Sequence, residues 1–159
     1  YIINTVCKFY ELEGESMVKI FGKKLENITY QSRQGVYAII INSTKDKILT
    51  VKTSRGDYFL PGGGIENTET YQECLEREIL EETGYTALIG NFIGNAKSYF
   101  LSTKKEPLLN DGYFYLAELL EKSQEPIEVD HFVQWIELDK IELLVHEHHR
   151  WAVREGIKI

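Results

Sequence analysis

Short apolar runs separated by turn residues dominate the chain and predict a domain rich in strands. The run Val36–Ile41 is uninterrupted and rich in β-branched residues, which indicates a buried strand. Residues 17–31 predict one or two short strands around Gly22, and Pro61–Gly64 is expected to break regular structure. Further strands, with a polar loop around Lys104–Asp111 between two of them, are predicted at Ile48–Lys52, Tyr58–Leu60, Leu88–Leu101, Gly112–Ala117 and His131–Glu137.

Two segments have the spacing of helices. Residues 70–83 form the clearest one, because Thr70 and Glu73 have capping-box spacing at its start and Gly84 stands where a C-cap residue belongs. Residues 139–154 predict one or two further helices. Many strands with few helices favour the α/β class, as a layered α/β/α sandwich with a mixed β-sheet.

The length of 159 residues fits one domain with its own core. The chain opens with Tyr1, and Met17 is a candidate natural start. We therefore interpret residues 1–16 as an N-terminal extension and residues 17–159 as a single domain. Cys7 and Cys74 are widely spaced and form no CxxC motif, which favours a reducing, cytoplasmic setting.

Charge and hydropathy narrow the expected partners. The net charge of −7 argues against a protein that wraps a nucleic acid polymer, because such proteins need a basic face. The longest apolar run, Val36–Ile41, is far shorter than the ~20 residues of a membrane span, so no membrane partner is expected. A small anionic ligand remains compatible, since a bound cation can bridge acid to acid. The sequence leaves open whether the chain is a monomer or a homodimer.

Three acids of the predicted helix share its apolar side. At ~100° per residue, Glu78, Glu81 and Glu82 fall on the arc that also carries Tyr71, Cys74, Leu75 and Ile79. Glu73 and Glu76 fall on the far side and are expected to be ordinary solvated charges. Cys74 is expected to be a core residue and not a nucleophile.

Such crowding needs compensation. Like charges three or four residues apart destabilise a helix, and these acids also lie near its C-terminal end, where the dipole disfavours anions. A hard divalent cation, Mg²⁺ or alternatively Mn²⁺, would relieve the repulsion, because carboxylates are its preferred ligands. The competing interpretation is that acidic helices are common and usually just solvated.

A glycine run precedes this helix. Gly62, Gly63 and Gly64 free the backbone to approach a ligand closely, and such a loop can offer N–H groups to phosphate oxygens and a carbonyl to a metal. Arg33, at the mouth of the first long strand, is a further candidate phosphate contact, although a surface charge is the commoner role for such a residue.

Loop and helix together read Gly63-x5-Glu69-x7-Arg77-Glu78-Ile79-x-Glu81-Glu82-x-Gly84-Tyr85. This pattern resembles the Nudix box, the signature of the Nudix (MutT-like) hydrolase family. Each fixed position from Gly63 to Gly84 is present at the family's spacing, and the last position, usually aliphatic, is Tyr85 here. The lead-in Tyr58–Gly63 is also similar to the family's.

The resemblance implies a Nudix-like sandwich and a Mg²⁺-dependent hydrolase that cuts a phosphate anhydride in a nucleoside diphosphate linked to another group. A MutT-like nucleoside triphosphate pyrophosphohydrolase is the default. Glu78, Glu81 and Glu82 would be the catalytic, metal-binding acids, with the Gly62 carbonyl as a further ligand. Glu69 and Arg77 would pair structurally. Glu78 is the first candidate for the general base, and a later-loop acid is left open among Glu118, Glu121, Glu125 and Glu128.

Three alternatives were weighed. A catalytically silent nucleotide-sensing module on the same fold could dispense with its metal acids, whereas all three are present. An isopentenyl-diphosphate isomerase is expected to have its own catalytic cysteine, and Cys74 in the box helix is the one candidate. His146 and His149 have the spacing of a metal-ligand pair, but an amphipathic C-terminal helix with Trp151 inward is the favoured interpretation.

Overall fold

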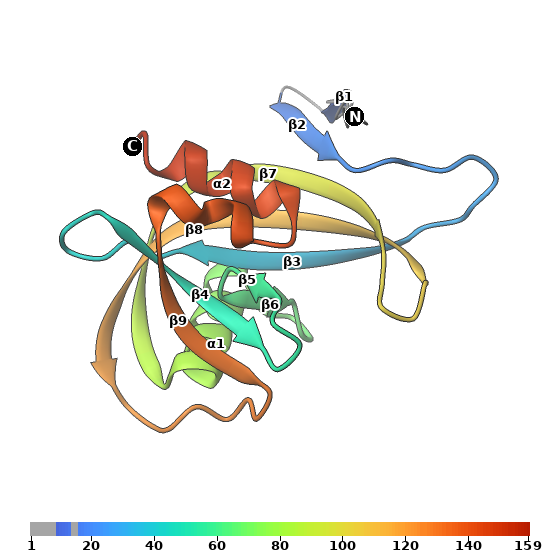
Figure 1. Cartoon of the computed structure of the whole chain (residues 1–159). Coiled ribbons are helices and arrows are strands. Elements are labelled where there is room, and N and C mark those ends of the chain that lie inside the picture. Colours follow the sequence, from blue (N-terminus) through green and yellow to red (C-terminus); the bar gives the residue numbers. More distant parts are fainter. Residues whose placement is uncertain (1–8, 14–15) are drawn as a thin grey trace.

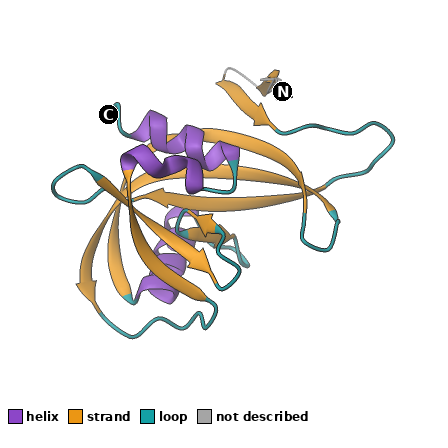
Figure 2. Cartoon of the chain, viewed as in Figure 1, coloured by secondary structure: helices purple, strands orange, loops and turns teal. Residues whose placement is uncertain are grey.

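A computed structural model describes residues 9–13 and 16–159 of the chain. Two sheets and two α-helices make up the fold (Figure 2). In chain order the elements are β1 (Phe9–Glu13), β2 (Ser16–Phe21), β3 (Gln31–Ile39), β4 (Lys47–Thr53), β5 (Tyr58–Phe59), β6 (Gly62–Gly64), α1 (Tyr71–Thr83), β7 (Tyr85–Leu101), β8 (Pro107–Lys122), β9 (His131–Glu137), the 3₁₀ segment η1 (Leu138–Leu143) and α2 (Glu147–Gly156).

The larger sheet is mixed and lies between the two helices. Its order is β1-β2-β7-β8-β3-β6, with β3 parallel to β8 and β7 antiparallel to β8. A smaller antiparallel sheet has the order β5-β4-β9. In Figure 1, α2 lies on one side of the long strands and α1 on the other. The predicted α/β/α sandwich with a mixed sheet is confirmed.

Strand β3 divides the interior into two cores. Side chains alternate in direction along β3 and at the residue after it. Val36, Ala38 and Ile40 pack in the core that contains Leu75 of α1, while Ile39 packs in the core under α2. Burial on both faces explains why the β-branched run reads as one continuous apolar stretch.

Several predicted boundaries are confirmed. In α1 the Thr70 hydroxyl accepts the Glu73 N–H at 3.1 Å, and Gly84 ends the helix at φ 79°. Strand β9 covers the predicted residues 131–137. The C-terminal prediction is also met, by η1 and α2, with Trp151 packed against the core.

The prediction that Pro61–Gly64 breaks regular structure is wrong. Residues 62–64 form β6, which pairs antiparallel with Gly35–Tyr37 of β3. Close approach explains the pairing, because a Cβ on Gly62 would lie 2.1 Å from the Val36 carbonyl oxygen, and Gly62 has φ 142°. Strand β8 also begins inside the expected polar loop, at Pro107.

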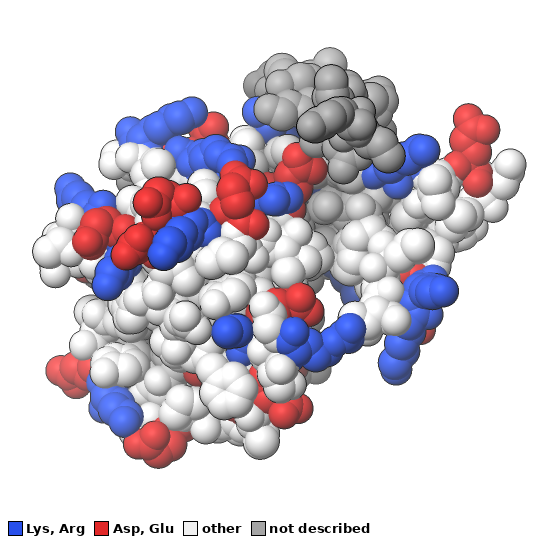
Figure 3. All heavy atoms as spheres, in the orientation of Figure 1, with Lys and Arg blue, Asp and Glu red and all other residues white. Residues whose placement is uncertain are grey.

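Strands β1 and β2 form one edge of the larger sheet. β1 pairs with β2, and β2 runs parallel to β7 through Lys19–Phe21. Residues 1–8 and 14–15 lie outside the described part, so the division at residue 16 stays a prediction. Within residues 9–13 and 16–159, no helix is long and apolar enough to cross a membrane. Acidic and basic side chains are interspersed on the face in Figure 3. Glu142, for example, forms ion pairs with Arg150 and Arg154.

Candidate functional site

The acids of α1 differ in burial as the helical wheel predicts. The Glu82 side chain is 4% exposed, Glu78 13% and Glu81 33%. Glu73 is exposed, and Glu76 is half-buried rather than fully solvated. The three predicted site acids therefore lie on the side of the helix that faces the rest of the fold.

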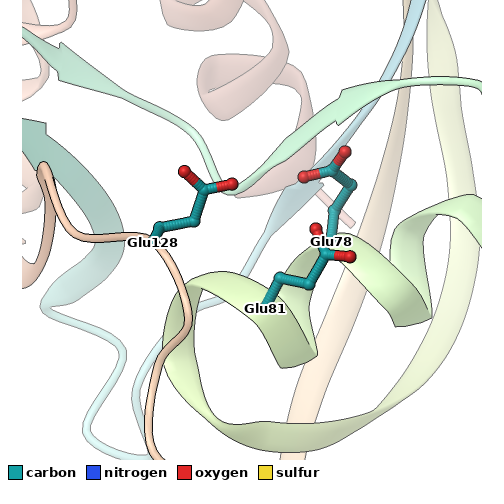
Figure 4. A group of neighbouring side chains, drawn as sticks. All are labelled: Glu78, Glu81 and Glu128. Carbon is teal, nitrogen blue, oxygen red and sulfur yellow. The ribbon is translucent and has the colours of Figure 1, made fainter.

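A fourth acid completes the cluster from a distant part of the chain. Carboxylate oxygens of Glu78, Glu81 and Glu128 all lie within 4.8 Å of one another. Figure 4 shows Glu128 reaching from the segment between β8 and β9 toward the two acids of α1. The structure thereby distinguishes Glu128 from the other later acids, since Glu118 and Glu121 belong to β8 and Glu125 pairs with Lys122 at 2.9 Å.

The segment that carries Glu128 is fixed to the end of α1. The Ile127 N–H donates to the Glu81 carbonyl at 2.8 Å, and the Ser123 and Gln124 N–H groups donate to the Gly84 carbonyl at 2.8 and 3.2 Å. A Cβ on Gly84 would lie 2.0 Å from the Gln124 carbonyl oxygen. Gly84 therefore ends the helix and also leaves room for the segment 123–127.

The glycine strand β6 backs the acids. A Cβ on Gly63 would lie 2.5 Å from a Glu78 carboxylate oxygen, so a larger residue there would displace that side chain. The Gly62 N–H donates to Oε1 of Glu82 at 2.8 Å. The role predicted for the Gly62 carbonyl as a metal ligand stays a prediction.

Arg77 joins the loop to the helix, as the motif implied. Its guanidinium binds the Glu69 carboxylate through two nitrogens and donates to the Gly64 carbonyl at 3.1 Å. It also lies 3.0 Å from Glu78 and 3.4 Å from Glu81. Repulsion among the acids is thus partly offset by the protein itself. Crowding of the acids therefore does not by itself require a metal, because the long Arg77 side chain reaches two of them.

His131, the first residue of β9, lies beside two of the acids. Its Nδ1 is 3.5 Å from Oε2 of Glu82 and 3.5 Å from Oε2 of Glu128. The contact with Glu82 raises the pKa of His131, while burial raises the pKa of the Glu82 carboxyl. Sequence reasoning missed His131, because Glu128, three residues before it, was only one of four candidate acids.

Protonation of the carboxyls differs with their surroundings. Burial, followed by the charge of Glu82, raises the pKa of Glu78 to about 7. The hydrogen bonds from Arg77 lower the pKa of Glu69 to about 2. Glu78 is thus the acid of the site that can gain or lose a proton near neutrality, which is the property of a general base.

The donor set fits a divalent cation. Hard carboxylate oxygens from α1 and from residue 128 converge within 4.8 Å, in a space that a side chain on Gly63 would invade. These are the ligands and the ligand charge that Mg²⁺ and Mn²⁺ prefer.

The remaining residues singled out in the sequence have different surroundings. Arg33 is exposed on β3, and its phosphate-binding role stays a prediction. Burial raises the pKa of the Cys74 thiol to about 12, in keeping with a core residue. His148 and His149, on α2, are buried, and Nε2 of His148 lies 2.8 Å from Oδ1 of Asn110. Both observations agree with packing and not with a metal site.

The chain has relatives among known proteins. The family model for the NUDIX domain matches residues 31–155. The chain is 37% identical over 81 residues to a zebrafish (Danio rerio) oxidized purine nucleoside triphosphate hydrolase, a match that covers 50% of this chain and 49% of that protein. The chain thus spans about half the length of this curated relative.

Solved structures share the fold. A NUDIX hydrolase from Nitrosomonas europaea superposes with a TM-score of 0.68 at 18% identity, over 80% of this chain and 90% of the other. A MutT protein from Methanosarcina mazei gives 0.62 at 23% identity, over 83% and 98%. At these identities the likeness concerns the fold.

Proposed function

The chain belongs to the Nudix hydrolase family, and from this premise we propose that it hydrolyses a phosphate anhydride in a nucleoside diphosphate linked to another group. The observation that carries the proposal is the convergence of Glu78, Glu81 and Glu128 beside the glycine strand β6. An acidic helix with a purely structural role would not need a further carboxylate, and here Glu128 supplies one from the segment between β8 and β9.

Glu78, Glu81 and Glu128 would hold the divalent cation, with Glu82 and the Gly62 carbonyl as further candidates. When bound, Mg²⁺ would neutralise the diphosphate charge and acidify the attacking water. Mn²⁺ is the alternative ion. Glu78 would accept the proton of the water, because its carboxylate lies in the acid cluster beside β6, where the water would be held.

The remaining motif residues prepare the site. Arg77 and Glu69 hold β6 against α1, so the acids face a fixed backbone. The absence of side chains at Gly62 and Gly63 leaves room for phosphate oxygens beside the acids. Arg33 would contact a phosphate from the exposed end of β3. Water attack on one phosphorus breaks the bridging P–O bond and leaves two phosphate products.

For the substrate class we propose a nucleoside triphosphate, cleaved to the monophosphate and pyrophosphate in the manner of MutT-like enzymes. The similarity to a relative named for oxidized purine nucleoside triphosphates supports this choice. No nucleic acid polymer or membrane is part of the proposed reaction.

The test is turnover of a panel of purified substrates with and without Mg²⁺, with products separated by chromatography. The panel contains normal and oxidised nucleoside triphosphates and ADP-ribose. We expect Mg²⁺-dependent release of monophosphate and pyrophosphate from a triphosphate, and a rate at least about 10²-fold lower with E78Q protein. Nucleotide binding without turnover under every condition would instead identify a silent sensing module.

A further inference from the structure

His131 occupies a fixed position between the Glu128 segment and the smaller sheet. It opens β9 and pairs with Thr53 of β4, and the neighbouring Asp130 carbonyl accepts the Ser54 N–H at 3.2 Å. Its side chain is 35% exposed. Backbone pairing on the β4 side therefore sets where the imidazole lies.

One ring nitrogen of His131 faces two carboxylates. Nδ1 lies 3.5 Å from Oε2 of Glu82 and 3.5 Å from Oε2 of Glu128. Since the other oxygen of Glu82 already accepts the Gly62 N–H, Oε2 is the one left to face the ring. At these distances an N–H on Nδ1 would face a carboxylate oxygen of both acids.

Four carboxylates meet at this site, and Arg77 and His131 contact two of them each. Arg77 contacts Glu78 and Glu81, while His131 contacts Glu82 and Glu128. Glu128 is the acid in most need of such a contact. Its side chain is 38% exposed, stands on an irregular segment, and points toward two carboxylates of α1 that repel it.

We propose that His131 is a positioning residue of the acidic site, which holds the Glu128 side chain toward Glu78 and Glu81 and fixes the free oxygen of Glu82. The inference rests on the proposed function. His131 acts through the carboxylates and does not itself touch the reacting atoms. Loss of its ring leaves Glu128 free to turn to solvent, so a metal ion loses one of three oxygen ligands.

The direct test is Mn²⁺ affinity, measured by calorimetry on wild-type, H131A and H131N proteins without nucleotide. Groups that orient metal ligands are worth about 10–100-fold in affinity, and we expect a loss of that size in H131A. H131N should recover much of it, because the Asn amide places an N–H near the position of Nδ1. Q134A, on the same strand, serves as the matched control, and thermal unfolding checks that each variant folds.

A double-mutant cycle separates positioning from general damage. If His131 acts through Glu128, H131A added to E128Q should weaken Mn²⁺ binding by much less than it does in wild-type protein. Equal fold-losses in the two backgrounds, or H131A protein that binds Mn²⁺ as wild-type does, would overturn the positioning role. Wild-type protein that binds Mn²⁺ but hydrolyses no nucleotide would overturn the proposed function and leave this inference standing.

Discussion

At the residue scale, neighbouring glycines of β6 have different tasks. A Cβ on Gly63 would lie 2.5 Å from a Glu78 oxygen, whereas a Cβ on Gly64 would have its nearest neighbour, the Gln34 carbonyl, at 3.9 Å. Gly63 therefore protects the position of a site acid. Gly64 contributes its backbone, through the carbonyl that accepts from Arg77.

The substitution G63A should impair catalysis while sparing stability. The new methyl group would push the Glu78 carboxylate, the free end of a flexible side chain, out of place, and a misplacement of about 1 Å can cost about 10²-fold in rate. Steady-state kinetics gives kcat/KM, and urea unfolding gives the stability. G64A is the control and should keep the wild-type rate. Equal rates for G63A and G64A would show that the Glu78 position does not matter.

Glu78 and Glu76 provide a second matched pair, both on α1. Glu76 accepts a hydrogen bond from Gln72 at 2.9 Å, one turn away, while Glu78 lies in the acid cluster. E78Q should lower Mg²⁺-dependent turnover by at least about 10²-fold, because a general base alone contributes 10²–10⁴-fold. E76Q should retain nearly full turnover. Similar losses in the two variants would contradict the placement of the acids.

At the element scale, the C-terminal end of α1 is the part that assembles the site. Carbonyls left free at this helix end accept N–H groups from residues 123, 124 and 127, which brings Glu128 beside the helix acids. The helix itself could be predicted from the sequence because Thr70, Glu73 and Gly84 are local signals. The position of Glu128 beside the helix could not be predicted, because it depends on how far β8 extends before the chain turns back.

Gly84 should be sensitive to substitution for two reasons. It has φ 79°, and a Cβ would lie 2.0 Å from the Gln124 carbonyl oxygen, whereas Gly56, at φ 90°, would meet nothing within 4 Å. The substitution G56A introduces backbone strain alone, whereas G84A adds a steric clash. The free energy of unfolding should therefore fall by about 1–3 kcal/mol more in G84A than in G56A, which is the usual cost of overpacking. Chemical denaturation measures both. Equal destabilisation would mean that the segment 123–127 moves aside without cost.

At the scale of the whole molecule, the acids of the site lie on the α1 side of the larger sheet, and three histidines pack on the α2 side. Under α2, His148 and His149 are buried, and His146 lies between Phe59 and Phe100, with ring centroids 5.4 and 4.9 Å away. Burial lowers the pKa of His146 to about 4. Spacing alone had suggested a metal pair for His146 and His149, and the tertiary packing explains why they serve the core instead.

His146 should make the fold sensitive to acid. Its pKa is about 4 in the folded protein and ~6.5 in an unfolded chain, so the unfolded state binds the proton first as pH falls. The stability that depends on a neutral His146 is complete above pH ~6.5 and is lost by pH ~4, a change of about 3 kcal/mol. H146F should escape this loss. The difference in unfolding free energy between H146F and wild type should grow as pH falls, and parallel curves would contradict the assignment.

Features of the site that depend on residues close together in the sequence could be predicted, whereas those that depend on distant residues could not. The Glu69–Arg77 pair and the three acids of α1 lie within one motif and were found from spacing. The β6 pairing, Glu128 and His131 depend on strands that meet only in the folded chain. The mixed sheet could be predicted, because buried β-branched runs and turn residues are local features of the sequence.

The central claim is that Glu78, Glu81 and Glu128 together hold a divalent cation. The most direct measurement is an anomalous difference map from a crystal of the protein soaked in Mn²⁺. We predict a peak about 2 Å from a carboxylate oxygen of each of these three residues, beside β6. A map without a peak at that position, with the three side chains turned toward solvent, would contradict the account.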